Sequence, residues 1–354
     1  MKSSMEGKSI ISGTGFAGIL SGVRRIVIAV HSHPDGDAIG SGAGLLHFIG
    51  ETLGKEAVLT IPDPIPDNLS FLLEGVPRGS VLFHHENPEE TVSAISEADL
   101  IVCLDMNAFN RSGALEEPLA ASGAKKVLVD HHLNPDSGAF DIVFSDTRVS
   151  STCELLYRIL METEQIGHDA SRLPHATATA LMAGMTTDTN NFANSVFPGT
   201  LAMASALLAA GVDRDAIVNE IYRTYRENRI RLMGYLLDKR LCITPCGVAY
   251  MILDKETMSR FGITEGETEG FVNIPLSIGR VRMSIFLRED EGFFRVSVRS
   301  KEGTSANSLA MKYFNGGGHE LAAGGKLFFP ADIPSREDAA PYIVRVTGVF
   351  FEGK

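Results

Sequence analysis

Histidine and aspartate side chains, which commonly bind metal ions, follow one apolar run near the start of the chain. Residues 26–30 are β-branched or apolar throughout, which is typical of a strand buried on both faces of a sheet. His31, Asp35 and Asp37 come directly after it. Ligands of open α/β sheets bind at the carboxyl ends of strands, so these residues predict a divalent-cation site. The same carboxylates could instead cap the following helix, which we expect to open with the glycine-rich residues 40–44. This stretch alone leaves both interpretations open.

Similar side chains end two more apolar runs and one predicted helix. The runs cover residues 99–105 and 125–130, and the helix begins near residue 174. The polar residues at or just after their ends are Asp105, Asp130, His131, His132 and Asp188. Strand ends of a parallel sheet meet at one edge, so we expect these groups to converge with the first set.

The order of predicted elements divides the chain into three parts. Strands and helices alternate over residues 1–212, which predicts an α/β domain with a doubly wound, mostly parallel sheet. Residues 213–244 are polar, with apolar side chains at helical spacing, and are typical of a helical connector. Residues 245–354 predict a smaller α/β domain, with strands at 248–253, 280–288 and 293–299 and a helix at 305–314.

The net charge of the 354-residue chain is −12, which argues against a protein that coats long nucleic acid. Residues 245–354 hold 13 Lys and Arg against 14 Asp and Glu, so the excess acidity lies in residues 1–244. An acidic lobe that can hold cations and a nearly neutral lobe with arginines suit a small phosphorylated ligand. A need for solubility would explain the acidity equally well.

The composition favours a cytoplasmic protein with no membrane association. The longest apolar N-terminal run, residues 10–23, precedes its arginines, which is the reverse of the order in a signal peptide. Apolar runs of the ~20 residues that cross a bilayer do not occur. Four cysteines are too few for a disulfide framework in a chain of this size, and we expect all four to be reduced.

The strand-end residues together form a set of hard oxygen and imidazole ligands large enough for two divalent ions. The set contains His31, Asp35, Asp37, Asp105, His131, His132 and Asp188. The absence of thiolates favours manganese, with magnesium as the second choice, over structural zinc. Two ions ~3.5–4 Å apart lower the pKa of a shared water and hold phosphate oxygens for in-line attack. Phosphoester hydrolysis is the reaction that this set favours.

These residues resemble the motifs of the DHH-family phosphoesterases that carry a DHH-associated C-terminal domain. The four motifs appear in order as His31-Ser-His-Pro-Asp-Gly-Asp37, Asp105 with Arg111-Ser-Gly113, Asp130-His131-His132, and Thr187-Asp188-Thr189. The segments Arg299-Ser300, Asn307 and Gly316-Gly-Gly-His319 resemble the associated domain. The resemblance therefore spans nearly the whole chain and implies the fold predicted above.

The resemblance also implies roles for the metal-site residues. One ion would be held by His31, Asp35 and Asp105, and the other by Asp37, Asp105, His131 and Asp188, with Asp105 bridging. The catalytic residues would be Asp105, His132, which would face the phosphate, and Asp130, which would orient its neighbours.

Three further positions near these motifs carry weaker signals. Arg111 has either a substrate-binding or a structural role, and the sequence leaves both open. Asn190 stands where the family usually has Gly, and Asn is the residue other than Gly that best tolerates a positive φ. His33 occupies a variable position of the first motif, where we expect an exposed neighbour and not a ligand.

The second domain would bind the substrate through a second group of residues. The resemblance implies Arg299, Ser300, Asn307, Gly316, Gly317, Gly318 and His319. The glycine run would offer unshielded backbone N–H groups to a phosphate, although a simple turn after Phe314 would also explain the glycines. Arg295 shares a strand face with Arg299 and is the weaker candidate for a phosphate ligand.

Within the family, two-domain chains resemble oligoribonucleases that degrade very short RNA to mononucleotides and dephosphorylate adenosine 3′,5′-bisphosphate. The expected partners are thus short RNA, linear dinucleotides and phosphorylated nucleotides, with no long nucleic acid, and a homodimer is compatible with the sequence. The alternatives are a pyrophosphatase or short-chain polyphosphatase of the same family, and a non-catalytic nucleotide-binding regulator.

Overall fold

The computed structural model describes residues 13–264 and 266–352. The chain forms two compact units, which divide between Thr224 and Tyr225. The predicted connector, residues 213–244, contributes a helix to each unit: α8 (Arg214–Tyr222) to the first and α9 (Glu227–Tyr235) to the second. None of the helices within the described ranges is both long enough and apolar enough to cross a bilayer.

The first unit is built on a six-stranded sheet in which every pair of neighbours is parallel. Its strands are β1 (Ile26–Ala29), β2 (Ala57–Ile61), β3 (Val81–Phe83), β4 (Leu100–Leu104), β5 (Lys125–Asp130) and β6 (Ile142–Ser145). They lie in the order β3-β2-β1-β4-β5-β6, which confirms the predicted doubly wound sheet. The order reverses between β1 and β4, and ligands of such sheets bind at this reversal.

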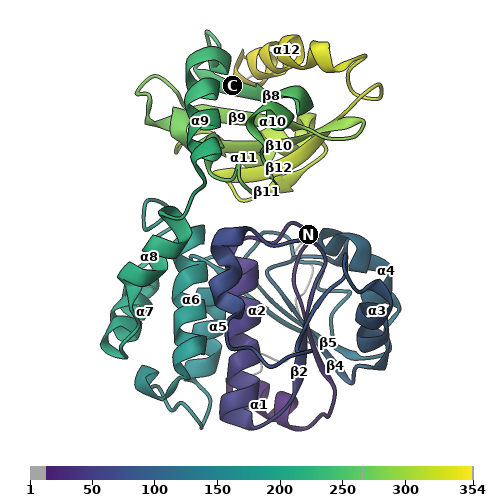
Figure 1. Cartoon of the computed structure of the whole chain (residues 1–354), viewed down its shortest axis with the longest axis vertical. Helices are drawn as coiled ribbons and strands as arrows, with labels where there is room; N and C mark the ends of the chain where they lie inside the picture. Colours follow the sequence, from purple (N-terminus) through teal and green to yellow (C-terminus); the bar gives the residue numbers. More distant parts are fainter. Residues whose placement is uncertain (1–12, 265, 353–354) are drawn as a thin grey trace, which may run out of the picture. The chain divides into compact units, whose positions relative to one another are not determined.

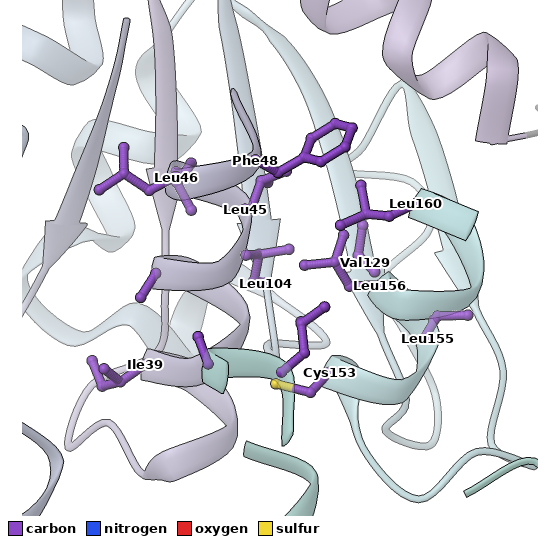
Figure 2. Close-up of a cluster of buried hydrophobic side chains, with 14 of the residues drawn as sticks. Ile39, Leu45, Leu46, Phe48, Leu104, Val129, Cys153, Leu155, Leu156 and Leu160 are labelled. Atoms are coloured by element: carbon purple, nitrogen blue, oxygen red, sulfur yellow. The ribbon is translucent and has the colours of Figure 1, made fainter. Parts of the chain in front are cut away.

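Helices cover both faces of this sheet (Figure 1). The helices of this unit are α1 (Gly13–Ser21), α2 (Gly36–His47), α3 (Pro88–Glu97), α4 (Glu116–Ala121), α5 (Thr152–Met161), α6 (His175–Asp188), α7 (Pro198–Ala209) and α8. α2, α5 and α6 lie on one face, and α3 and α4 lie on the other (Figure 1). Figure 2 shows side chains of α2 and α5 meeting Leu104 and Val129 of the sheet in a buried apolar cluster. This core fixes the starts of α2 and α5 relative to the strand ends.

The second unit contains a mixed sheet with helices on both faces. Its strands are β7 (Cys242–Ile243), β8 (Val248–Leu253), β9 (Met283–Glu289), β10 (Phe293–Ser300), β11 (Gly317–Gly318) and β12 (Ala322–Phe328). Its helices are α9, α10 (Lys255–Phe261), α11 (Ala306–Tyr313) and α12 (Ala339–Glu352). The strands lie in the order β11-β12-β10-β9-β8-β7, and only β8 and β9 pair in parallel. One apolar cluster joins the sheet to α11 and α12, and another joins it to α9.

Several elements differ from the sequence prediction. α2 begins at Gly36 and not near Gly40, because Asp35 caps it there. The prediction omitted the short strand β6, the glycine-containing strand β12 and helix α12. It also treated residues 213–244 as one helical connector, whereas α8 ends at Tyr222 and α9 begins at Glu227.

The packing of α2 against α6 depends on glycines at their contact. A Cβ atom added at Gly40 would lie 2.6 Å from the carbonyl oxygen of Ala180 and 3.0 Å from the Cα atom of Gly184. Both neighbours are backbone atoms and cannot turn aside as a flexible side chain would. Gly40 therefore sets the separation of two helices that carry Asp37 and Asp188.

We expect Gly40→Ala to lower the free energy of unfolding by about 1–3 kcal/mol, the usual cost of overpacking a core. Urea denaturation followed by circular dichroism measures the change. Gly18→Ala in α1 is the matched control, because a Cβ there meets no described atom within 4 Å and an exposed helical Gly→Ala change stabilises by about 0.5–1 kcal/mol. Equal stability of parent and Gly40→Ala would contradict the close-contact argument.

Candidate metal centre

The strand-end residues meet where the first unit's sheet reverses its order. His31 lies two residues beyond β1, Asp105 follows β4 directly, and Asp130 is the last residue of β5. β1 pairs with β4, and β4 pairs with β5, so the three side chains come from adjacent strands. All three are buried, with at most 4% of their surface exposed. The predicted convergence of the strand ends at one edge is therefore present.

Asp35 caps helix α2. Its Oδ1 atom accepts hydrogen bonds from the N–H groups of Asp37 at 3.0 Å and Ala38 at 3.1 Å. The capping interpretation is thus correct for this carboxylate. It does not exclude metal binding, because Asp35, His31 and Asp105 each also place a ligand atom within 4.8 Å of the others.

Asp37 is held by the N-terminus of α5. Its Oδ2 atom accepts a hydrogen bond from the N–H of Thr152 at 2.6 Å, and its Oδ1 atom accepts one from Cys153 at 2.9 Å. Burial raises the pKa of Asp37 well above its usual range, and the charges of Asp105 and Asp188 raise it further. A divalent cation would remove that repulsion, since it supplies the positive charge that the carboxylates lack.

The hydroxyl of Thr152 extends the same contact to the second carboxylate. Its Oγ1 atom donates a hydrogen bond to Asp105 Oδ1 at 3.0 Å. The first residue of α5 therefore fixes two acidic side chains that lie 68 positions apart in the chain, Asp37 and Asp105. Asp105 itself has a φ of +58°, a left-handed conformation that Asp adopts more readily than most residues.

His31 faces the carboxylates through Nε2. Its Nδ1 atom lies 2.9 Å from the carbonyl oxygen of Ser32, which can only accept, so Nδ1 carries a proton. Nε2 is buried and has no hydrogen-bond partner among the described residues, although it lies 3.3 Å from Asp105 Oδ2 and 3.7 Å from Asp35 Oδ1. A buried imidazole nitrogen that faces two carboxylates fits a metal ligand.

The electrostatics of His31 and Asp105 lead to the same conclusion. Burial alone would lower the pKa of His31, but Asp105 and Asp35 outweigh it and raise that pKa to about 10. Burial alone would raise the pKa of Asp105, but the imidazoles of His31 and His132 outweigh it and lower that pKa. Without metal, Nε2 therefore holds a proton that a divalent cation would replace.

His131 lies among three carboxylates. Its Nε2 atom is 3.4 Å from Asp188 Oδ2, 3.6 Å from Asp105 Oδ1 and 3.8 Å from Asp37 Oδ2. Only 5% of its side chain is exposed. His31, Asp35 and Asp105 thus form one candidate ligand group, and Asp37, Asp105 and His131 form a second. Asp105 belongs to both, which is the arrangement that two neighbouring ions with one bridging carboxylate require.

His132 is oriented by Asp130. Its Nδ1 atom lies 2.7 Å from Asp130 Oδ1, and its backbone N–H donates to Asp130 Oδ2 at 3.1 Å. An ionised carboxylate only accepts, so the contact places the Nδ1 proton on the Asp130 side and directs Nε2 the other way. His132 Nδ1 is also 3.6 Å from Asp105 Oδ1, next to the two ligand groups.

The positions with weaker signals lie around this centre. Arg111 is half-buried, its charge acts on His31, and its carbonyl accepts the N–H of Ser32 at 2.7 Å. His33 is exposed, as predicted, and its backbone N–H donates to Asp63 at 2.8 Å. Asn190 has a φ of +47°, the left-handed conformation expected where the family has Gly.

The predicted substrate residues of the second unit surround one end of β10. Arg299 Nη1 donates to the carbonyl oxygens of Val298 at 3.0 Å and Ala323 at 3.5 Å. The hydroxyl of Ser300 is buried and donates to the carbonyl of Thr304 at 2.8 Å. Asn307 Oδ1 accepts the N–H of Gly318 at 2.9 Å.

The glycine run has partners within the unit. The N–H groups of Gly316 and His319 donate to the carbonyl oxygens of Ala310 and Ala322. Gly317 and Gly318 form β11, which pairs with β12. A Cβ at Gly316 would lie 1.9 Å from the carbonyl oxygen of Gly324. Close backbone packing therefore explains Gly316 and Gly318, and the N–H groups expected from the sequence to be unshielded are engaged at Gly316, Gly318 and His319.

The role of the α5 N-terminus was not predicted from the sequence. Ser151 does cap the helix, with its hydroxyl accepting the N–H of Glu154 at 3.0 Å. The buried Glu154 accepts hydrogen bonds from Ser150 and from Thr200 of α7. The capping pattern Ser-x-x-Glu was the available signal, but it gives no indication of which loop lies opposite.

The comparisons with known proteins agree with this architecture. Residues 25–185 match the model of the DHH family, N-terminal domain, and residues 246–335 match that of the DHHA1 domain. The bifunctional oligoribonuclease and PAP phosphatase NrnA of Bacillus subtilis is 30% identical over 86% of this chain and 89% of its own. Its namesake in Thermus thermophilus is 30% identical over 85% of this chain and 84% of its own.

A solved structure resembles the whole chain. The crystal structure of an exopolyphosphatase-related protein from Bacteroides fragilis has a TM-score of 0.84, 35% sequence identity and coverage of 98% of both chains. With its parallel sheet, its ordered motifs and these relatives, the chain belongs to the DHH family and carries a DHHA1 domain in its second unit.

Proposed function

We propose that this DHH-family phosphoesterase hydrolyses short RNA oligonucleotides, including linear dinucleotides, to mononucleotides and dephosphorylates adenosine 3′,5′-bisphosphate to AMP. The observation that carries the proposal is the pair of candidate ligand groups that share Asp105. The names of the Bacillus and Thermus relatives, which join an oligoribonuclease to a PAP phosphatase, support the substrates.

The same residues would hold two divalent ions, with manganese as the first choice and magnesium as the second. His31, Asp35 and Asp105 would bind one ion, and Asp37, Asp105, His131 and Asp188 the other. Carboxylate and imidazole donors without thiolates suit manganese and magnesium. When bound, such ions lower the pKa of water and neutralise charge on a phosphate.

The protein's own groups would then position the substrate. Asp130 holds the Nδ1 side of His132, so the Nε2 side is available to a phosphate oxygen or a leaving group. Arg111 contributes positive charge near His31. In the second unit, Arg299 and His319 remain the proposed anion ligands, with Ser300, Asn307 and the glycine run shaping the strand ends behind them.

A second candidate is hydrolysis of pyrophosphate or short polyphosphate. It is favoured by the similarity, at 35% identity, to the exopolyphosphatase-related protein of Bacteroides fragilis. The cytoplasm remains the proposed compartment, because all four cysteines are free and Cys103 and Cys153 are buried.

We expect the purified chain with Mn²⁺ to hydrolyse a linear dinucleotide and adenosine 3′,5′-bisphosphate with a kcat/KM at least about tenfold above that for pyrophosphate, since specificity is the ratio of these constants. Product separation by anion-exchange chromatography provides the rates. Turnover confined to pyrophosphate or tripolyphosphate would establish the second candidate instead. Nucleotide binding with no turnover of any substrate would indicate a regulator.

We expect His131→Ala to weaken Mn²⁺ binding and to reduce dinucleotide hydrolysis by ~100-fold or more, because the imidazole lies among the three carboxylates of the second group. Isothermal titration calorimetry and steady-state rates measure the two effects. His175→Ala is the matched control, since this exposed histidine begins α6 at the end opposite Asp188. Loss of function in both variants would show a general effect of histidine removal.

We expect Thr152→Val to weaken Mn²⁺ binding by about tenfold, as the loss of a group that orients a ligand commonly does. Valine keeps the backbone N–H that donates a hydrogen bond to Asp37 but lacks the hydroxyl that donates one to Asp105. Thr152→Ser retains both donors and should bind Mn²⁺ like the parent. Calorimetric titration of the three proteins decides, and equal affinity of the Val and Ser variants would contradict a positioning role.

A further inference from the structure

Glu154 is a fully buried carboxylate that the proposed chemistry does not use. It is the third residue of α5, and none of its surface is exposed. Its Oε2 atom accepts hydrogen bonds from the N–H of Ser150 at 2.9 Å, the hydroxyl of Ser150 at 2.7 Å and the hydroxyl of Thr200 at 2.6 Å. Its Oε1 atom pairs with Arg158, one turn further along α5. Both carboxylate oxygens are thus engaged, as a buried charge requires.

These contacts join two helices of the first unit. Glu154 belongs to α5, whereas Thr200 lies in the first turn of α7, 46 positions later. The hydroxyl of Thr200 also accepts the N–H of Phe197 at 3.1 Å, so one side chain ties the start of α7 to the carboxylate. A Cβ atom at Gly199 would lie 2.8 Å from Glu154 Oε1, which shows how closely α7 packs here.

The turn that Glu154 holds leads directly to the candidate metal centre. Ser150 and Glu154 lie on either side of Thr152 and Cys153 in the chain. The N–H groups of Thr152 and Cys153 donate to the two carboxylate oxygens of Asp37. Because both sides of this short segment are bonded to one buried carboxylate, a shift of that carboxylate would move both N–H groups relative to Asp37.

Helix capping alone does not account for the position of Glu154. In a capping box the third helical residue accepts the N–H of the N-cap residue. The N-cap of α5 is Ser151, but Glu154 accepts the N–H of Ser150, one residue earlier. An exposed glutamate could cap a helix without the cost of burial, and buried ion pairs add little stability compared with apolar groups. The buried contacts instead hold one defined geometry between α5 and α7.

We propose that Glu154 is a positioning residue for the metal centre and that α7 braces the centre through it. The carboxylate holds the start of α5 so that its N–H groups meet Asp37 and the hydroxyl of Thr152 meets Asp105. The proposal rests on the metal-binding part of the proposed function and is independent of the substrate.

The contact with α7 is tested at Thr200, because loss of the buried Glu154 carboxylate could prevent folding. We expect Thr200→Val to raise the Kd for Mn²⁺ by about fivefold, less than the roughly tenfold loss caused by removing a group that touches a ligand. Valine keeps the shape of the side chain but lacks the hydroxyl that donates to Glu154. Thr200→Ser retains this donor and should bind Mn²⁺ like the parent in calorimetric titration. Equal affinity of the Val and Ser variants would overturn the proposal.

Thr91→Val is the matched control. Thr91 is also fully buried, and its hydroxyl donates to the carbonyl oxygen of Asn87 at 2.8 Å. It belongs to α3, on the other face of the sheet (Figure 1). We expect Thr91→Val and Thr200→Val both to lower the urea midpoint, and only Thr200→Val to weaken Mn²⁺ binding. An equal loss of Mn²⁺ affinity in both variants would indicate general destabilisation and overturn the proposal.

A second measurement uses the metal-free protein. Hydrogen exchange in EDTA, resolved by mass spectrometry with electron-transfer fragmentation, reports local opening at the N–H groups of Thr152 and Cys153. We expect exchange there to be at least about threefold faster in Thr200→Val and unchanged in Thr91→Val, because only the first variant loosens the turn. Unchanged exchange in Thr200→Val would overturn the positioning role. Mn²⁺ titration of the parent chain tests the metal site separately, so each idea can fail alone.

Discussion

The first unit depends on how it accommodates carboxylates that are buried close to one another. Asp37 and Asp105 are almost fully buried and lie close enough for each to affect the other's pKa. Ionised carboxylates so placed are costly unless donors or cations surround them. The fold supplies the donors, because α5 directs two N–H groups at Asp37 and a hydroxyl at Asp105. The imidazoles of His31 and His131 provide the remaining partners, which a metal ion would join or replace.

Most of the candidate site was predictable because its residues are local to strand ends. A buried strand that finishes in Asp or His can be recognised from composition alone, and parallel strands bring such ends together. The sequence therefore predicts the correct edge of the sheet for Asp105 and Asp130. The contact of Thr152 with Asp37 was not predictable in this way, since 115 positions separate the two residues and only the tertiary packing of α2 and α5 joins them.

The errors in the fold have similar physical causes. β12 reads Ala-Ala-Gly-Gly-Lys-Leu-Phe, and its glycines lower its tendency to form a strand. It forms because β10 pairs with it along seven residues, a contact that outweighs local preference. The same pairing gives the glycine run its partners and brings Lys326 beside Arg295. The sequence left the glycine run open between a phosphate site and a simple turn, and close backbone packing accounts for Gly316 and Gly318.

The left-handed backbone at Asp105 restricts which amino acids this position can accept. A residue there must combine a φ of +58° with a side-chain oxygen that can belong to both candidate metal-ligand groups. Glycine satisfies the first condition without the second, and glutamate satisfies the second while straining the first. Asparagine tolerates the left-handed backbone and has a single carbonyl oxygen in place of the carboxylate. Asp105→Asn would therefore remove the negative charge while keeping the shape of the side chain. The backbone conformation after β4 and the need for a shared carboxylate thus together restrict position 105 to very few amino acids.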